Sequence, residues 1–213
     1  MEFDLLYNYF INNPFEFIVL LLGVVYIILE FFGNKWMWFI GFLMAVLSLY
    51  VFVDNEHYWL GAIQVYQIAL SIYGFWKWQF GRKKTLNHDI NGQTTARTEQ
   101  PITRMPKRAW CLSLLSVVAI TVILALLNDS LLKNELPWAD AAITAFNLVA
   151  VVLLSQKYLE QWFFWLVYDS LMIVVSLVEG RMYFYIVLCV IYIITSIFGY
   201  FKWRRMMLES QTN

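Results

Sequence analysis

Asp169 is the residue whose chemistry in this sequence most needs an explanation. It is the one charged residue in WFFWLVYDSLMIVVSL, residues 162–177, and its neighbours are apolar, aromatic or small. A carboxylate at the centre of a membrane helix costs about 2.5–3.5 kcal/mol on insertion scales, so it usually faces a partner, a ligand or a wet cavity. Aromatic faces attract cations by about 0.5–2 kcal/mol. Asp169 and its aromatic neighbours therefore predict a site for an organic cation, with a neutral structural carboxyl as the alternative.

Other polar side chains recur at helical spacing within apolar stretches. Residues three, four or seven apart share one face of a helix. Most of the polar and aromatic residues chosen from these stripes lie at or near the expected middle of the membrane, and Trp162 lies closer to a helix end. The predicted site residues are Gln64, Gln67, Ser71, Asn147, Trp162, Trp165, Asp169 and Tyr192. Buried polar groups can also simply join helices by hydrogen bonds worth about 0.6–2 kcal/mol, and that alternative stays open for the uncharged ones.

The composition places these residues in a membrane protein. Of the 213 residues, 61% are hydrophobic and 14% charged, whereas soluble domains are about a quarter charged. A membrane helix needs roughly 20 apolar residues. We expect an all-α polytopic membrane protein in a lipid bilayer, with seven transmembrane helices at about residues 15–32, 36–53, 58–80, 109–127, 138–156, 162–178 and 182–203.

One long polar connection sets the predicted orientation. Residues 81–108 are rich in Lys and Arg, and cytoplasmic loops collect such residues. Alternation from this loop places the N-terminus outside and the basic C-terminal tail in the cytoplasm. The part from 85 to 100 is rich in Thr, Asn and Gln, which predicts a flexible linker.

The sequence contains an internal repeat. SIYGFWKW at 71–78 and SIFGYFKW at 196–203 agree at Ser, Ile, Gly, Lys and the last Trp. They end the third and the seventh expected helix, so three helices are predicted to recur in parallel around a linker helix, with a substrate site near the midplane between the halves. The predicted parts are residues 1–80, the cytoplasmic linker 81–108, the linker helix 109–127, and the second repeat with its tail, 128–213.

Several other classes of function find no support in the sequence. The two cysteines are far apart and the two histidines fall in expected loops, so neither a disulfide nor a metal site is predicted. A net charge of zero gives no support to nucleic-acid binding. No nucleophile–base pair, phosphate-binding loop or lysine deep in the last helix is present, so an enzyme, a primary pump and a retinal protein are not expected. No cofactor is predicted.

The motifs resemble those of a known family. QVYQIALSIYGFWKW (64–78), PWADAAITAFNLVAVVLLSQKYLEQW (137–162) and WFFWLVYDSLMIVVSL, in a layout of three, one and three helices, look like the PnuC family of bacterial vitamin transporters. The resemblance implies a SWEET-like fold in the inner membrane, a homotrimer, and facilitated diffusion of nicotinamide riboside that cytoplasmic phosphorylation then traps. Related families carry thiamine or riboflavin.

The resemblance also suggests roles for the predicted site. Asp169 would balance the charge of the substrate, Trp165 and Tyr192 would stack on its ring, and Gln64, Gln67 and Asn147 would bind its hydroxyl or amide groups. Without a cation at this depth, phosphorylated substrates would be rejected. Many family members have Asn rather than Asp near position 169. This departure leaves nicotinamide riboside, thiamine and proton-coupled symport through Asp169 all open.

Overall fold

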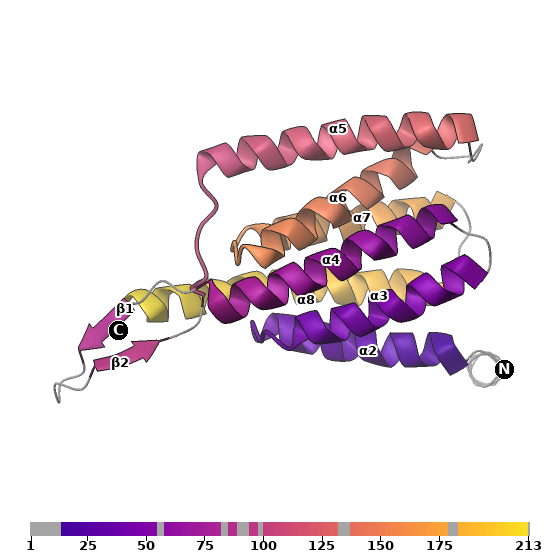
Figure 1. Cartoon of the computed structure of the whole chain (residues 1–213). Coiled ribbons are helices and arrows are strands. Elements are labelled where there is room, and N and C mark those ends of the chain that lie inside the picture. Colours follow the sequence, from indigo (N-terminus) through magenta and orange to yellow (C-terminus); the bar gives the residue numbers. More distant parts are fainter. Residues whose placement is uncertain are drawn as a thin grey trace. The chain divides into compact units, whose positions relative to one another are not determined.

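The helices of the chain, drawn in Figure 1, belong to two compact units. The computed structural model describes residues 14–54, 58–81, 85–88, 94–97, 100–131, 137–178 and 183–212. The first unit holds α2 (Pro14–Phe31), α3 (Met37–Asp54) and α4 (Tyr58–Phe80), and the second holds α5 (Lys107–Leu131), α6 (Pro137–Ser155), α7 (Gln161–Val178) and α8 (Tyr183–Thr212). In the first unit α3 packs against both α2 and α4, and in the second α5, α6, α7 and α8 pack in succession.

The seven expected helices are present in the expected order among the described residues. By length and composition, α3, α5, α6, α7 and α8 can each cross a membrane. In α2 the apolar part that qualifies is shorter, Leu21–Phe31. The helix α4 is not among the candidate spans, and it carries three glutamines and Lys77 among its apolar residues.

Two expectations about the polar segments need correction. The last helix does not end near residue 203, because α8 continues to Thr212. Its last turns gain an ion pair between Arg205 and Glu209, at 2.8 Å and one turn apart, which supports a helix. The linker is not wholly flexible either, since β1 (Thr85–His88) pairs with β2 (Thr94–Arg97). Threonine favours strands. Residues 82–84, 89–93 and 98–99 of the linker lie outside the described residues.

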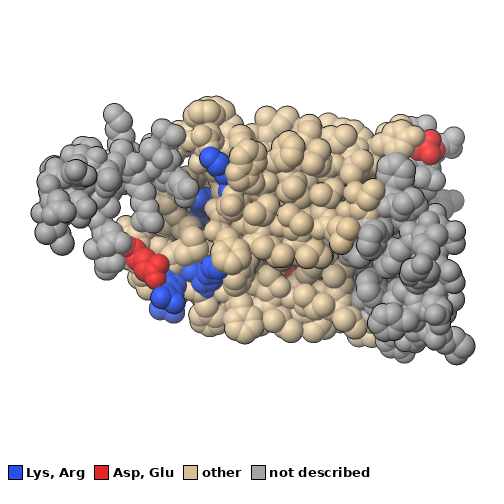
Figure 2. All heavy atoms as spheres, turned by 90° about the horizontal axis from the view of Figure 1, so that it is seen from below, with Lys and Arg blue, Asp and Glu red and all other residues tan. Residues whose placement is uncertain are grey.

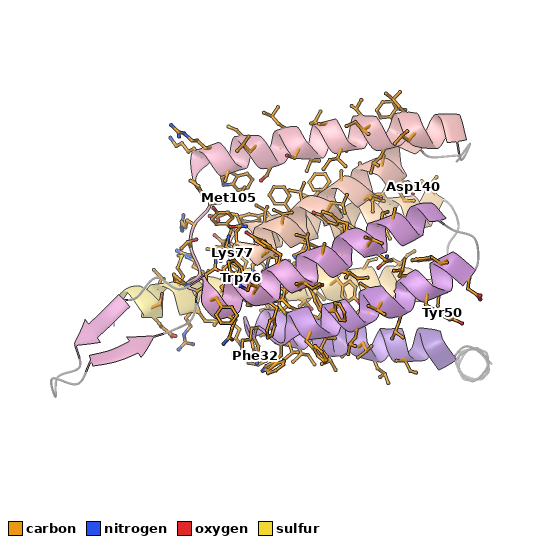
Figure 3. All side chains as sticks on the ribbon, viewed as in Figure 1. Phe32, Tyr50, Trp76, Lys77, Met105 and Asp140 are labelled. Atoms are coloured by element: carbon orange, nitrogen blue, oxygen red, sulfur yellow. The ribbon has the colours of Figure 1, made fainter. Side chains whose placement is uncertain are left out.

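Several charged side chains lie at or near the ends of the helices, whereas Asp169 lies within α7. In the first unit Lys35 Nζ donates to Gln79 Oε1 at 2.5 Å, which joins the α2–α3 turn to the end of α4. In Figure 3, Lys77 lies at this same end and Tyr50 at the other. In the second unit Asp140 lies in the first turn of α6, and Figure 3 shows it at the opposite end of this unit from Met105. Figure 2 shows a face whose middle is formed almost entirely by uncharged residues, as a lipid-facing surface requires.

The turns that end α2 and α6 have the same geometry. Each contains a residue in the left-handed region, Gly33 with φ 63° and Lys157 with φ 55°. In both turns two N–H groups donate back to the helix in the pattern of a Schellman cap. The four hydrogen bonds are Gly33 N to Glu30 O at 2.8 Å, Asn34 N to Leu29 O at 2.9 Å, Lys157 N to Leu154 O at 2.9 Å and Tyr158 N to Leu153 O at 3.3 Å. The internal repeat therefore extends beyond its sequence motif.

Gly33→Ala is expected to lower the free energy of unfolding by about 1 kcal/mol, because a Cβ is unfavourable at positive φ. Gly61→Ala is the matched control. Gly61 lies inside α4, and a Cβ there would meet Leu49 Cδ1 at an ordinary 3.5 Å. Thermal melting of the purified protein in detergent measures both variants. Equal melting temperatures for the two would contradict the role given to the left-handed turn.

The first unit has a close contact between a tryptophan and a glycine. Trp38 of α3 lies over Gly74 of α4, so close that a Cβ on Gly74 would come within 2.4 Å of the indole ring. The same indole meets Trp78 edge-on, with ring centroids 5.7 Å apart and an angle of 87°. Both tryptophans are buried. The glycine of SIYGFWKW therefore allows α3 and α4 to approach.

The second unit repeats this arrangement. Trp162 of α7 lies over Gly199 of α8, where a Cβ would come within 2.6 Å of the ring. Trp162 meets Trp203 edge-on at 5.6 Å and 88°. The shared Gly and Trp of the repeated motif thus serve the same packing in both units, which explains why those positions agree.

Candidate substrate site

Asp169 lies at the middle of α7 and is 3% exposed. It lies within electrostatic range of Cys189 on α8. Cys189 in turn belongs to an apolar cluster with Ile143 of α6 and with Met172 and Val175 of α7. The carboxylate is therefore enclosed where α6, α7 and α8 meet. Within the described part of the chain, no side chain pairs with it by an ion pair or a hydrogen bond.

Trp165 lies one helical turn before Asp169 on the same face of α7. Its ring is half-buried and meets Tyr168 edge-on, with centroids 5.8 Å apart. The indole Nε1 is buried and has no hydrogen-bond acceptor among the described residues. Buried donors are nearly always paired, so an unpaired one needs an explanation. A lone carboxylate and a lone N–H donor one turn apart suit a ligand that carries both a positive charge and an acceptor.

Ser176 is a polar group that the predicted site does not include. It lies two turns after Asp169 on α7, is fully buried, and its Oγ finds no partner in the described structure. Its spacing of seven residues from Asp169 places it on the same helical stripe, but its expected depth near the end of the helix left it out of the predicted site. Ser176 extends the line of unpaired polar groups along α7.

Trp162 has a different environment from Trp165. It is 3% exposed and covers Gly199 and Trp203, so its ring is occupied in packing. Its Nε1 is also buried, with no acceptor among the residues described. The geometry gives Trp162 a structural role at the start of α7. Its contact with a substrate stays a prediction.

The remaining residues of the second unit lie on the helices beside α7. Asn147 of α6 and Tyr192 of α8 are both half-buried, and α6 and α8 each pack against α7. Tyr192 lies one turn from Cys189, the residue that faces Asp169. The second unit therefore supplies a carboxylate, an indole, a phenol and an amide from three adjoining helices.

The residues predicted in the first unit lie on α4. Gln64 and Gln67 are half-buried and Ser71 is buried. Ser71 lies at a tight crossing of helices, because a Cβ on Gly41 of α3 would be 3.4 Å from Ser71 Oγ and 3.1 Å from Tyr26. The structure brings these three together within the first unit, and their approach to Asp169 stays a prediction.

The repeat register shows that the two units are not chemically equivalent. Aligning SIYGFWKW with SIFGYFKW places Gln64 opposite Cys189 and Gln67 opposite Tyr192. Aligning Trp38 with Trp162 places the buried Ala45 of α3 opposite Asp169. The carboxylate thus has no counterpart in the first unit. Among the described residues no group of three or more His, Cys, Asp or Glu could hold a metal ion.

Comparisons with known proteins agree with one another. A family model described as nicotinamide mononucleotide transporter matches residues 13–205. A nicotinamide riboside transporter, PnuC of Neisseria mucosa, is 27% identical over 169 residues, which cover 75% of this chain and 61% of that protein. The riboflavin/roseoflavin transporter RibM of Streptomyces davaonensis is 24% identical over 162 residues, 75% of this chain and 70% of that one. The match thus spans less than two thirds of the Neisseria protein.

A solved structure shows the same fold. The crystal structure of the vitamin B3 transporter PnuC superposes with a TM-score of 0.67 and 19% identity, over 97% of this chain and 88% of that one. The largely helical architecture is therefore the fold of that protein, and the resemblance to the PnuC family is confirmed. With a family model matching residues 13–205, this chain belongs to the nicotinamide mononucleotide transporter family.

Proposed function

We propose that this protein takes up nicotinamide riboside across the bacterial plasma membrane by facilitated diffusion. The observation that carries the proposal is a pair of buried groups one turn apart on α7, the Asp169 carboxylate and the Trp165 Nε1–H, for which the described part of the chain supplies no ion-pair or hydrogen-bond partner. The Neisseria mucosa relative, which matches 75% of this chain, is described as a nicotinamide riboside transporter.

The chemistry of nicotinamide riboside fits this pair. Its pyridinium ring is a flat cation, which the carboxylate of Asp169 would balance and the rings of Trp165 and Tyr192 would stack on. Its carboxamide oxygen would accept from Trp165 Nε1. The ribose hydroxyls would be hydrogen-bonded by Gln64, Gln67 and Asn147. Ser71 follows the two glutamines on α4, and Trp162 lies in the first turn of α7.

Selection against the phosphorylated product follows from charge. A phosphate needs Lys, Arg or a row of backbone N–H groups. The described Lys and Arg of α4 and α5 lie near the ends of those helices, those of α8 lie in its final third, and Asp169 would repel an anion. A cytoplasmic kinase that phosphorylates the riboside would then trap it inside.

We propose a parallel arrangement of two three-helix repeats joined by α5, as in SWEET proteins, with the N-terminus outside and the C-terminus in the cytoplasm. The matching Schellman turns and the matching Trp–Gly contacts support the repeat. The basic residues of the α2–α3 turn, of α4 and of the α8 tail support the orientation. A homotrimer is part of the same proposal, from the family resemblance alone.

Thiamine is the second candidate substrate, because it is also a flat organic cation and Asp169 suits any such ligand. One relative is described as a riboflavin/roseoflavin transporter. Riboflavin is neutral, however, so its binding would gain no charge attraction from the Asp169 carboxylate. A symporter that carries a proton on Asp169 is the alternative mechanism.

Uptake of labelled substrate into proteoliposomes tests the proposed function. We expect nicotinamide riboside to equilibrate without any gradient, and nicotinamide mononucleotide to be excluded. Accumulation above equilibrium that requires a proton gradient would establish symport. Uptake indistinguishable from that of protein-free liposomes would contradict the proposal.

A further inference from the structure

The end of the linker is bound to the turn between α6 and α7. Residues 101–106, which we call the strap, precede α5, and Thr103 forms an isolated parallel β-bridge with Tyr158. The Thr103 N–H donates to the Lys157 carbonyl at 3.1 Å, and the Thr103 carbonyl accepts the Leu159 N–H at 2.9 Å. Two backbone hydrogen bonds therefore fix the strap on the residues that lead into α7.

The strap also binds the residue that directly precedes α7. The Met105 N–H donates to Oε2 of Glu160 at 2.7 Å, in a buried hydrogen bond. The carbonyl of Glu160 accepts the Phe163 N–H at 3.1 Å, so Glu160 begins the first turn of the helix. A carboxylate there also interacts favourably with the positive end of the helix dipole.

The side chain of Met105 makes a second connection. It is 6% exposed and belongs to an apolar cluster with Val149 of α6 and Phe164 of α7. Trp165 packs against the same cluster. The strap thus connects to α7 through the Glu160 carboxylate and through the apolar cluster that Met105 shares with Phe164. The helix cannot turn about its axis without breaking one of these contacts.

We propose that Glu160 and Met105 are positioning residues for the substrate site. By fixing the rotation of α7, the strap fixes the direction in which Trp165 and Asp169 point. This inference rests on the proposed function, because only there do those two side chains contact a substrate. Binding groups must be held to within about 0.5 Å by their surroundings, and such support comes from packing and hydrogen bonds like those of the strap.

Two matched pairs of full-length variants test the proposal. Thr103→Pro removes the donor to Lys157, whereas Thr103→Ala keeps the backbone N–H and changes only an exposed side chain. Glu160→Ala removes the acceptor for Met105, whereas Glu160→Gln keeps an oxygen there. The net contribution of one hydrogen bond, about 0.5–1.5 kcal/mol, corresponds to a few-fold to tenfold change in a dissociation constant. We expect Thr103→Pro and Glu160→Ala to weaken nicotinamide riboside binding by about that much, and their controls by less than about twofold.

Hydrogen–deuterium exchange without ligand gives a readout that does not depend on the substrate. We expect faster exchange at residues 161–166 in Thr103→Pro and Glu160→Ala, and rates like those of the wild type in the two controls. Unchanged exchange in both disruptive variants would overturn the positioning role, whatever their affinity. If the wild type binds no nicotinamide riboside but exchange responds as expected, the proposed function fails and the control of α7 by the strap stands. If Thr103→Pro does not fold, equal affinity and exchange in Glu160→Ala and Glu160→Gln would overturn the inference.

Discussion

Gly199→Ala is expected to destabilise the second unit by about 2–3 kcal/mol. A Cβ at this position would lie 2.6 Å from two carbons of the Trp162 ring and 2.8 Å from a third. Real Cβ atoms do not approach so closely, and Trp162 has little room to move because Trp203 packs edge-on against it. Overpacking of this kind typically costs about 1–3 kcal/mol and more where neighbours are rigid.

The measurement is the melting temperature of the purified variant in detergent. Gly23→Ala is the control, because its Cβ would meet only the flexible end of Met44, at 3.6 Å. Gly74→Ala, the equivalent change in the first unit, should behave like Gly199→Ala, since its Cβ would come within 2.4 Å of Trp38. A Gly199→Ala protein as stable as the Gly23→Ala control would refute the Trp–Gly packing as a determinant of the fold.

Asp169→Asn is expected to weaken nicotinamide riboside binding by about ten- to a hundredfold. Because the pyridinium of nicotinamide riboside has no N–H, the loss is Coulombic. Two opposite unit charges about 6–10 Å apart attract by roughly 2–3 kcal/mol at an effective dielectric constant of about 20, and each 1.4 kcal/mol is a factor of ten in affinity. Asparagine keeps the shape and loses the charge. The stability of the variant should be unchanged or higher, because a buried charge that has no partner among the described residues is removed.

Titration calorimetry and thermal melting separate the two effects. Asp140→Asn, in the first turn of α6 and outside the proposed site, is the control and should bind like the wild type. If Asp169→Asn retained full affinity and uptake, Asp169 would have no role in balancing the substrate charge. A loss of affinity accompanied by an equal loss of stability would point to a structural carboxylate.

The elements that carry the site could be predicted because their signals are local. The apolar stretches are long enough to identify each helix, and the position of Asp169 within one of them showed that it needed a partner. The stripe of Trp165 and Asp169 followed from helical spacing alone. The motif shared by α4 and α8 revealed the repeat, although its physical reason, the close approach of a tryptophan to Gly74 and to Gly199, required coordinates.

Other features depend on contacts between distant parts of the chain and leave little trace in the sequence. The strap is bound largely through backbone groups, so no pattern of side chains marks Thr103 or Met105 as ligands of the α6–α7 turn. Lys157 adopts the left-handed geometry that a glycine has in the first unit, and the lysine itself gives no such signal. Ser176 shares the helical stripe of Asp169 in the sequence, but only the structure shows that its hydroxyl is buried with no partner among the described residues.

Parallel calorimetric titration of the detergent-purified protein with nicotinamide riboside and with thiamine tests the central claim most directly. We predict saturable binding of nicotinamide riboside that is much tighter than any binding of thiamine, and no binding of nicotinamide mononucleotide. Binding of thiamine alone would contradict the proposed substrate and make Asp169 the leading determinant of that different specificity. Absence of binding by either cation would contradict the assignment of α7 as the site for a cationic vitamin.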